Sequence, residues 1–600
     1  MRRAALALAL LAPLVGQAQD GRLLPADDPA MWWVERLQRR GHLLELPPTA
    51  APYTEGEVRD ALDGLGRLSA IERTWARALR RRLRPHVRPG RGEAAFTVEV
   101  AAGAVATNND RLSTLRWVES DAPVVGTEAV WAYPYATLGA ALQAGPLVAQ
   151  LGARFDTFYE DDPDGLDVAN KSVFIRNEGG YVGAVGRYGE VRLGRVDRRW
   201  SGADEDALFV GPTPRAYDAL AVRVGGGRAG VRSFLAELDA ADLDGQFTGR
   251  TGDRSREPSL RRYLAAHRLD WRPSRKVTVA GIETMLISGN GASVPLAALL
   301  PTAVYSFLND GPPKNNEHNG LLGGLLWFQV GRTTVSGQAL FDDFDLFFGV
   351  EPASAALSGS VVQAGVTDWA DAGLALTAAT ARTYNTLLPE QTYVYALRGI
   401  GLPFSDFVHA RVFSDLYLDG AVPGLSVRPE AHALWQGEAD FRQPFPDNSV
   451  PLILVGEAER VVRAGAVVRL QPSPWWFARA DLGVNWTHND GFERGAEAVR
   501  FVGLVEAGAR VRLGLAPSLG WWRPRRTPAS GWRSSPPDIS VRPDGASPHT
   551  RRPPCRSRRR RFRRWRRRRR RPPPACGGRA WRRVGWPGRS RAARGAPGPP

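Results

Sequence analysis

Between about residue 96 and residue 515, the chain alternates apolar and polar residues over unusually long segments. In 147–159 an apolar residue falls at nearly every second position from Leu147 to Tyr159, and the same period of two governs 476–486 and 499–515. These segments have 11 to 17 residues, whereas strands of soluble sheets usually have about five or six. A period of two over such lengths predicts strands that each present one long apolar face.

The opposite faces of these strands carry charges of both signs. A soluble β-sandwich buries its apolar faces and needs a turn about every 8–12 residues. A transmembrane barrel instead turns its apolar faces toward lipid and surrounds a wet, charged lumen. The segment 476–486 also has an indole at each end of its apolar face, as expected at two membrane interfaces. We therefore predict an all-β transmembrane barrel whose lumen is lined by Arg154, Asp156, Arg479, Asp481, Arg500 and Arg510.

The length of this region sets the number of strands. At roughly 23 residues for a strand and its connection, the 420 residues of 96–515 allow about 18 antiparallel strands. Connections rich in Asp, Gly, Pro and Asn are the expected outer loops. They lie at 107–127, 160–171, 198–215, 239–259, 288–318 and 438–450.

Residues 1–18 have the pattern of a secretory signal peptide. Two arginines precede an apolar stretch, Ala4 to Val15, that is too short to span a bilayer, and Gly16-Gln17-Ala18 fits a cleavage site. No run of 18 apolar residues follows, which excludes a helical inner-membrane protein. We expect an exported bacterial protein of the outer membrane, with outer-membrane lipid around a monomeric barrel.

Residues 19–90 predict a small periplasmic helical segment rather than strands. Asp28-Pro29 begins a first helix, which ends at Gly41. Two capping boxes, Thr54 with Glu57 and Ser69 with Glu72, begin helices at about 55–66 and 70–84. Apolar residues recur every three or four positions along both, so each has one face to bury.

Residues 521–600 break with the rest of the chain. They hold 26 of the 80 Lys and Arg, all of them Arg, and only two acids, so the tail carries about +24 and the remainder about −6. No apolar period is present, so we predict a disordered Arg/Pro-rich tail. A GC-rich gene read out of frame gives this composition. We favour that origin over a basic arm for nucleic acid or anionic lipid, because an exported protein meets little nucleic acid.

An ordered series of short motifs resembles the capsule assembly protein Wzi family. Leu24-Pro25-Ala26-Asp27-Asp28-Pro29 opens the series, and Gly194–Trp200, leading to Leu208-Phe209-Val210, comes next. His267-Arg268-Leu269-Asp270-Trp271 then precedes Val277–Glu283, and Asn315-Asn316 precedes Gly337–Phe344. The resemblance covers about residues 22–515. It implies an outer-membrane barrel of 18 strands with a periplasmic helical bundle, acting as a lectin that holds capsular polysaccharide on the cell surface.

The chain departs from the family in two places. Trp200 is followed by Ser201-Gly202, where the family tends to have Trp-Gly soon after the arginine equivalent to Arg195, so this loop is expected to differ. The chain also does not end in a strand with a terminal aromatic residue, which leaves closure of the barrel open. An unclosed barrel is excluded in lipid, because its edge would expose unpaired backbone groups.

Glycan binding needs aromatic platforms for sugar C–H faces and planar polar groups for hydroxyls. Two sets on expected outer loops fit. They are Arg198, Arg199, Trp200 and Asp204, and Tyr305 with Asn315 and Asn316. Polar loop residues beside an interface aromatic are the alternative interpretation of each. We interpret Asp342 and Asp343 as rim acids and His267 as a wall residue, and we predict no catalytic set, metal site or cofactor.

Three functions remain on these grounds. The first is a non-enzymatic lectin that binds capsular or surface polysaccharide and helps attach it to the cell surface. The second is a general or solute-selective porin, in which the lumen charges set selectivity. The third is an outer-membrane enzyme, for which the sequence offers no convergent Ser, His and Asp set.

Overall fold

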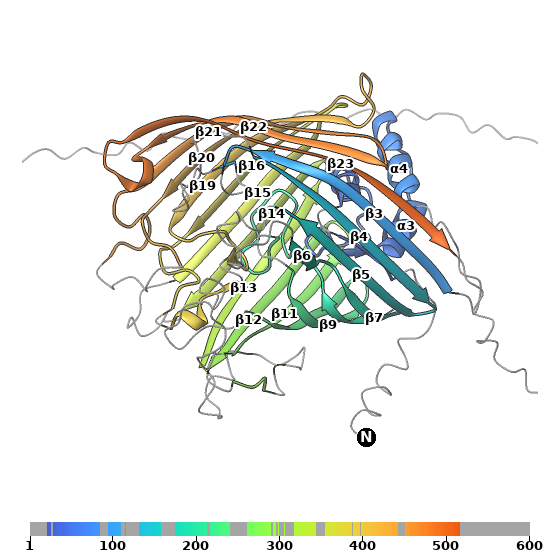
Figure 1. Ribbon diagram of the computed structural model, residues 1–600, viewed down its shortest axis with the longest axis horizontal. Coiled ribbons are helices and arrows are strands. Elements are labelled where there is room, and N and C mark those ends of the chain that lie inside the picture. Colours follow the sequence, from blue (N-terminus) through green and yellow to red (C-terminus); the bar gives the residue numbers. More distant parts are fainter. Residues whose placement is uncertain are drawn as a thin grey trace, which may run out of the picture. The chain divides into compact units, whose positions relative to one another are not determined.

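The computed structural model shows a closed β-barrel preceded by a small helical segment (Figure 1). The structure describes residues 21–25, 28–83, 94–109, 114–115, 131–157, 174–186, 188–212, 216–239, 261–289, 292–295, 298, 305, 317–343, 354–386, 388–395, 398–441 and 450–515. The predicted signal peptide at 1–18 and tail at 521–600 lie outside the described residues.

The wall strands run antiparallel in chain order. They are β3 Ala94–Thr107, β4 Trp131–Ala144, β5 Leu147–Asp156, β6 Phe174–Asn177, β7 Tyr181–Gly186, β8 Gly189–Arg195, β9 Asp218–Gly225, β10 Ala229–Glu237, β11 Arg261–Ser274, β12 Val277–Gly289, β13 Glu317–Val330, β14 Thr333–Asp343, β15 Ser354–Thr367, β16 Ala370–Ala379, β19 Phe407–Tyr417, β20 Leu425–Gln436, β21 Glu459–Ser473, β22 Trp476–His488 and β23 Glu497–Leu515. β6 and β7 pair with successive parts of β5 and form one interrupted strand, so the described wall has 18 strands. The predicted fold class is confirmed.

The barrel closes between its last and its first wall strand. β23 pairs with β3 from Leu504 opposite Thr107 to Leu515 opposite Phe96. The closing strand is therefore the alternating segment that the sequence places at 499–515. The sequence left closure of the barrel open. The pairing of β23 with β3, which are far apart in the sequence, closes it.

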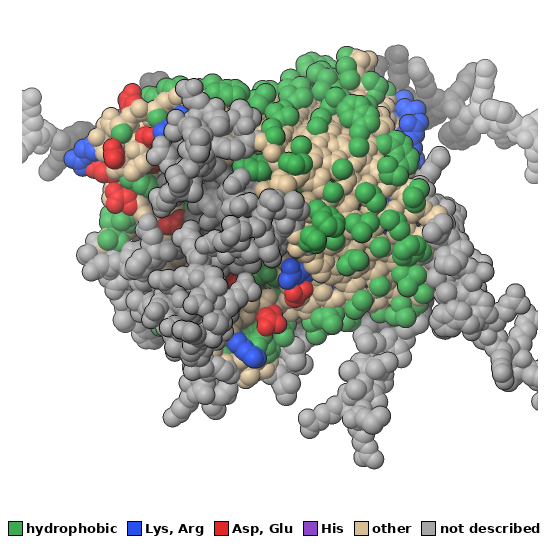
Figure 2. All heavy atoms as spheres, in the orientation of Figure 1, with side chains coloured by type: hydrophobic (Ala, Val, Ile, Leu, Met, Phe, Trp, Pro, Cys, Tyr) green, Lys and Arg blue, Asp and Glu red, His purple; other side chains and the backbone are tan. Residues whose placement is uncertain are grey.

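Large apolar side chains lie exposed on the outer face of the wall. In β22, Trp476, Leu482, Val484 and Trp486 are 38% to 50% exposed, whereas Asp481, on the opposite face, is buried. Figure 2 shows hydrophobic side chains spread over the broad wall, with charged side chains mainly toward its ends. A soluble monomer rarely exposes so large an apolar surface, and the band fits the hydrocarbon layer of a membrane.

One end of the barrel carries the short turns, such as those at Gly145, Gly331 and 474–475. Long connections join the strands at the other end. Outer-membrane barrels have short turns on the periplasmic side and longer loops outside, so the short-turn end is the expected periplasmic end. Among the described residues, no helix has the length and apolar character needed to cross a membrane.

The helical segment lies at one end of the barrel, seen at the right of Figure 1. It contains α2 Pro29–Arg39, α3 Glu55–Asp63 and α4 Ala70–Arg82, with β1 Leu23–Leu24 paired to β2 Tyr53–Thr54. Asp28 caps α2, and both predicted capping boxes are formed. The apolar stripes of the helices meet in one core that includes Trp33, Leu37, Val58, Trp75 and Leu79.

Candidate functional site: the barrel lumen

Buried ion pairs tie the helical segment to the wall. Arg39 of α2 binds Asp415 of β19 at 2.7 Å and Asp204 at 2.5 Å. Arg428 of β20 binds the same two carboxylates, at 2.6 and 3.2 Å. None of these four side chains is more than 9% exposed. Removing one member of such a network leaves an uncompensated buried charge, so the four hold each other in place.

Further pairs reach other parts of the wall. Arg40 binds Asp371 of β16 at 2.9 Å. At the last wall strand, Asp28 accepts a hydrogen bond from Arg510 of β23 at 2.6 Å. It also accepts one from Arg82 of α4 at 2.6 Å. Because β16 and β23 are separated by several strands, the helical segment lies across part of the short-turn end of the lumen.

The connection between β8 and β9 folds into the lumen. These two strands are short, so the chain leaves the wall early, and the described residues 196–212 turn inward. Arg199 forms a backbone bridge with Ala51 of the helical segment, and Ser336 of β14 donates a hydrogen bond to Glu205 at 2.7 Å. Gln338, also on β14, donates one to the carbonyl of Asp206 at 3.0 Å.

A second segment belongs to the connection between β16 and β19. Its described residues, 380–386, 388–395 and 398–406, enter the lumen from the long-loop end. The Tyr384 hydroxyl donates to the carbonyl of Leu208, and the Tyr393 hydroxyl donates to that of Phe209 at 2.9 Å. Arg262 of β11 donates to the carbonyls of Thr392 and Val394, at 2.7 and 3.0 Å. This segment therefore joins the inward loop to a wall strand distant from its own ends.

The two inward segments enclose an apolar core inside the barrel. Trp200 packs edge-on against Phe234 with ring centroids 5.5 Å apart, and Tyr384 stacks on Tyr393 at 5.3 Å. The core also includes Leu208, Phe209, Val210, Tyr217, Val394, Ile400, Leu402, Phe407 and Phe441, all buried. The expectation of a wet, charged lumen is thus wrong at this level, where loop side chains exclude water.

The first predicted sugar-binding set lies within this interior. Arg198, Trp200 and Asp204 are buried, and Arg199 binds Glu35 of α2 at 2.7 Å. The interpretation of 198–215 as an outer loop is wrong for its described residues, 198–212. The apolar run Leu208–Val210 is buried rather than exposed to solvent, and Asp204 finds its cationic partners, Arg39 and Arg428, inside the barrel.

The structure describes only one residue, Tyr305, of the second predicted sugar-binding set. Tyr305 is 1% exposed, its N–H donates to Glu283 of β12 at 2.8 Å, and its ring lies 4.4 Å from that of His267 of β11. Asn315 and Asn316 lie outside the described residues. His267 itself pairs with Glu283 at 3.1 Å, as a wall residue would.

The predicted lumen-lining residues lie on the inner face of their strands. Arg154 binds Asp156 at 2.8 Å, and Asp481 binds Arg463 at 2.8 Å. Two others pair across elements: Arg500 with Asp490 at 2.6 Å, and Arg510 with Asp28. Arg479 has no ion-pair partner within the described chain.

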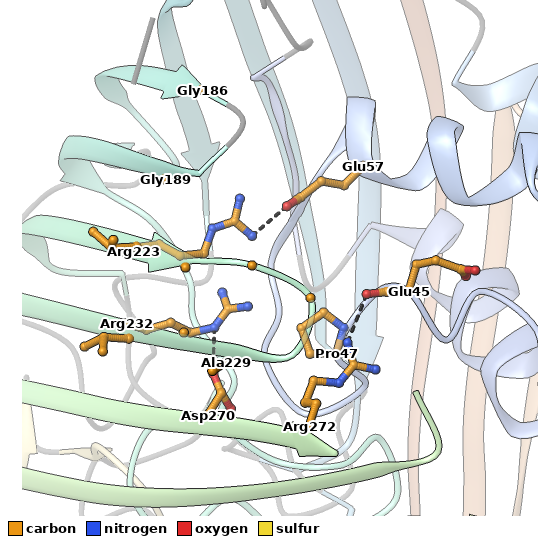
Figure 3. A pocket seen from close by; sticks show the side chains of 16 residues that line it. Glu45, Pro47, Glu57, Gly186, Gly189, Arg223, Ala229, Arg232, Asp270 and Arg272 are labelled. Atoms are coloured by element: carbon orange, nitrogen blue, oxygen red, sulfur yellow. Dashed lines mark hydrogen bonds and ion pairs between the residues drawn. The ribbon is translucent and has the colours of Figure 1, made fainter. Parts of the chain in front are cut away.

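Small charged cavities remain between the helical segment and the wall. One, of about 210 Å³, lies beside the hairpin that joins β9 and β10. Figure 3 shows Arg223 and Arg232 facing Glu57 and Asp270, with ion-pair distances of 2.6 and 3.2 Å. Another, of about 180 Å³, is lined by Arg154, Glu178 and residues of the helical segment.

Sequence reasoning missed the segment 380–406. Its sequence is typical of neither a strand nor an outer loop, because its apolar residues are irregularly spaced among polar ones. They include Tyr384, Tyr393, Ile400 and Leu402. Pro389 and Pro403, together with the absence of a period of two over 27 residues, are the available signals.

Comparison with known proteins identifies the fold. No protein-family model matches the chain, and no curated protein matches its sequence. Among solved structures, it is similar to Wzi of Escherichia coli, an outer-membrane protein involved in group 1 capsule assembly and a carbohydrate-binding β-barrel. The two share a TM-score of 0.54 at 12% identity, over 82% of this chain and 99% of that one. The folds are similar.

Weaker likeness extends to other outer-membrane barrels. OccAB4 of Acinetobacter baumannii has a TM-score of 0.39 at 7% identity, covering 70% of this chain and 98% of that one. OccK11 (OpdR) of Pseudomonas aeruginosa has a TM-score of 0.37 at 9% identity, covering 71% and 99%. At 12% identity, the likeness to Wzi shows the fold alone.

Proposed function

We propose that this chain is a non-enzymatic outer-membrane protein that binds capsular or surface polysaccharide and helps attach it to the cell surface. The observation that carries the proposal is the apolar core inside the barrel. Diffusion through a porin needs a continuous wet passage. Here Trp200, Phe209, Tyr384 and Tyr393 belong to one buried apolar cluster inside the barrel, and the helical segment lies at one end of the barrel.

Two further features support a surface-binding barrel. The exposed apolar band on the wall suits a protein held in the outer membrane. The fold is also similar to that of a barrel described as carbohydrate-binding and involved in capsule assembly. In this proposal the barrel is a rigid membrane anchor, and its long-loop end presents the binding surface.

The proposal assigns the polymer to the long-loop end. Asn315 and Asn316 stay candidates for sugar contact there. Arg198, Trp200, Asp204 and Tyr305 are buried, and we propose that they hold loops in shape instead of touching sugar. Several weak contacts along one polymer would add through avidity, so no single deep pocket is required.

The test is the partition of surface polysaccharide between cells and medium, with the gene deleted and with it restored. We expect deletion to release polymer while total synthesis stays constant. Purified protein in planar bilayers should show no steady ion conductance. If attachment is unchanged, uptake of small solutes falls and the protein conducts, the porin function replaces this proposal.

A further inference from the structure

Three arginines meet at the inner face of the wall near the periplasmic end. Arg469 of β21 and Arg479 of β22 are direct register partners, so their side chains project from neighbouring positions on the inner face. Ser426 of β20 is the register partner of Arg469 on its other side. Arg36 of α2 donates a hydrogen bond to that serine hydroxyl at 2.6 Å. Helix and wall thus bring Arg36, Arg469 and Arg479 to one place.

Nearby aromatic rings shape the same site. The Arg469 guanidinium lies over Trp32 of α2, 5.1 Å from the ring centroid. Arg36 lies over Tyr417, at 4.9 Å from the centroid. These rings offset part of the cost of holding arginines together, but they supply no net negative charge.

The three arginines have no carboxylate partner in the described part of the chain. The neighbouring acids are engaged elsewhere: Asp415 is shared by Arg39 and Arg428, and Asp419 accepts from the Trp75 indole at 3.3 Å. Glu506 stands opposite Arg479 in register, yet it accepts a hydrogen bond from Tyr135 at 2.8 Å and forms no ion pair with that arginine.

Like charges directly opposite one another in a sheet destabilise it. The Nε atoms of Arg469 and Arg479 are buried and lack a hydrogen-bond partner. As whole residues, Arg469 and Arg479 are partly buried. A cluster of this kind is short of negative charge and has donors that remain free.

We propose that Arg36, Arg469 and Arg479 form a binding site for one small oxyanion, a phosphate or carboxylate group, within the lumen. The planar guanidinium forks suit two-pronged hydrogen bonding to such groups. The bound anion would satisfy the free donors and remove the repulsion between the register partners. This site does not depend on the polysaccharide proposal, and its occupant could be free phosphate or the acidic group of a sugar.

The test is calorimetric titration of the purified full chain in detergent with inorganic phosphate and, separately, with D-glucuronate. Chloride at matched ionic strength and neutral glucose serve as blanks. We expect saturable binding of at least one anion. Arg469→Gln and Arg479→Gln should each weaken it by about tenfold or more. Arg460→Gln is the matched control, because Arg460 lies on the same strand as Arg469 and is exposed. The tighter of the two anions identifies the source of the ligand.

A second readout separates binding from simple loss of structure. Without added anion, Arg479→Gln should unfold at a higher temperature than the parent chain, since the substitution removes the like-charge contact. Phosphate should raise the unfolding temperature of the parent and of Arg460→Gln, but not that of Arg479→Gln. No saturable binding of either anion by the parent, or equal binding by all variants, overturns the proposal.

Discussion

At the scale of single residues, the lumen holds charges whose environments differ sharply. Asp204 and Asp415 are surrounded by arginines. Glu205, one residue along from Asp204, is buried without a cation: Ser336 and the Gly202 N–H donate to one oxygen, and the other has no partner among the described atoms. Burial raises the pKa of Glu205 from 4.5 to about 7.

This shift predicts a pH dependence with a definite sign. Between pH 4.5 and about 7 the folded chain keeps a proton on Glu205 that the unfolded chain has released, so stability falls as pH rises through this window. The Glu205→Gln chain should not show this decrease in the free energy of unfolding, which amounts to at most about 3 kcal/mol. The measurement is the unfolding temperature at pH 4.5 and pH 8 for both chains.

A matched variant checks the cause. The Ser336 hydroxyl stabilises the ionised carboxylate, so Ser336→Ala should raise the pKa of Glu205 further and move the pH midpoint upward. An identical pH profile in all three chains would contradict this account of Glu205.

The Arg39 and Arg428 network predicts a large effect from one substitution. Asp415→Ala leaves two buried arginines with only Asp204, and it should cost about 3–5 kcal/mol in the free energy of unfolding. The control is Asp218→Ala, which breaks an exposed pair with Arg195 and should cost less than about 1 kcal/mol. Denaturant unfolding in detergent compares the two, and similar costs would show that the network contributes little.

At the scale of elements, the helical segment is a separate packed unit that polar contacts fasten to the barrel. Its apolar core is joined by Tyr417 of β19. Arginines of the segment, such as Arg39 and Arg40, and arginines of the wall, such as Arg268 and Arg512, tie the two together. Such an element can detach locally without unfolding the strands, because local opening breaks only the contacts at its boundary.

We expect the double substitution Arg39→Ala and Arg40→Ala to accelerate amide hydrogen exchange in residues 29–82 by at least about tenfold, since it removes buried ion pairs. Exchange in β11 to β13 should stay unchanged. Arg73→Ala with Arg77→Ala, on the exposed face of α4, is the matched control. Faster exchange in the strands as well would mean that helices and barrel open as one unit.

At the scale of the whole molecule, the exposed apolar side chains on the outer face of the wall determine the depth of the barrel in the membrane. Leu151 in the middle of β5 and Leu147 at its short-turn end are both exposed, at 52% and 60%. Leu151→Arg should cost about 2–4 kcal/mol in a bilayer, and Leu147→Arg about 0–1 kcal/mol, because the cost depends on depth. Folding equilibria in lipid vesicles measure this difference. Equal costs would place β5 differently in the membrane.

Much of the architecture follows from local patterns. The period of two marks β5, β22 and β23 within a few residues, because each strand must keep one face apolar along its whole length. The caps at Asp28, Thr54 and Ser69 mark the helix starts, because their side chains satisfy nearby backbone groups. The interior could not be predicted this way, since an apolar run such as Leu208–Val210 looks the same on a strand or in a packed loop.

The sequence by itself determined that this chain is a membrane barrel of about 18 strands behind a helical segment, because alternation and capping are properties of neighbouring residues. Only the tertiary structure decided what fills the barrel. Arg39 meets Asp415, and Leu208 meets Tyr384, across separations of well over a hundred residues. Such partners are chosen by the closure of the wall, which brings distant segments into one enclosed space where apolar groups exclude water and charges must pair.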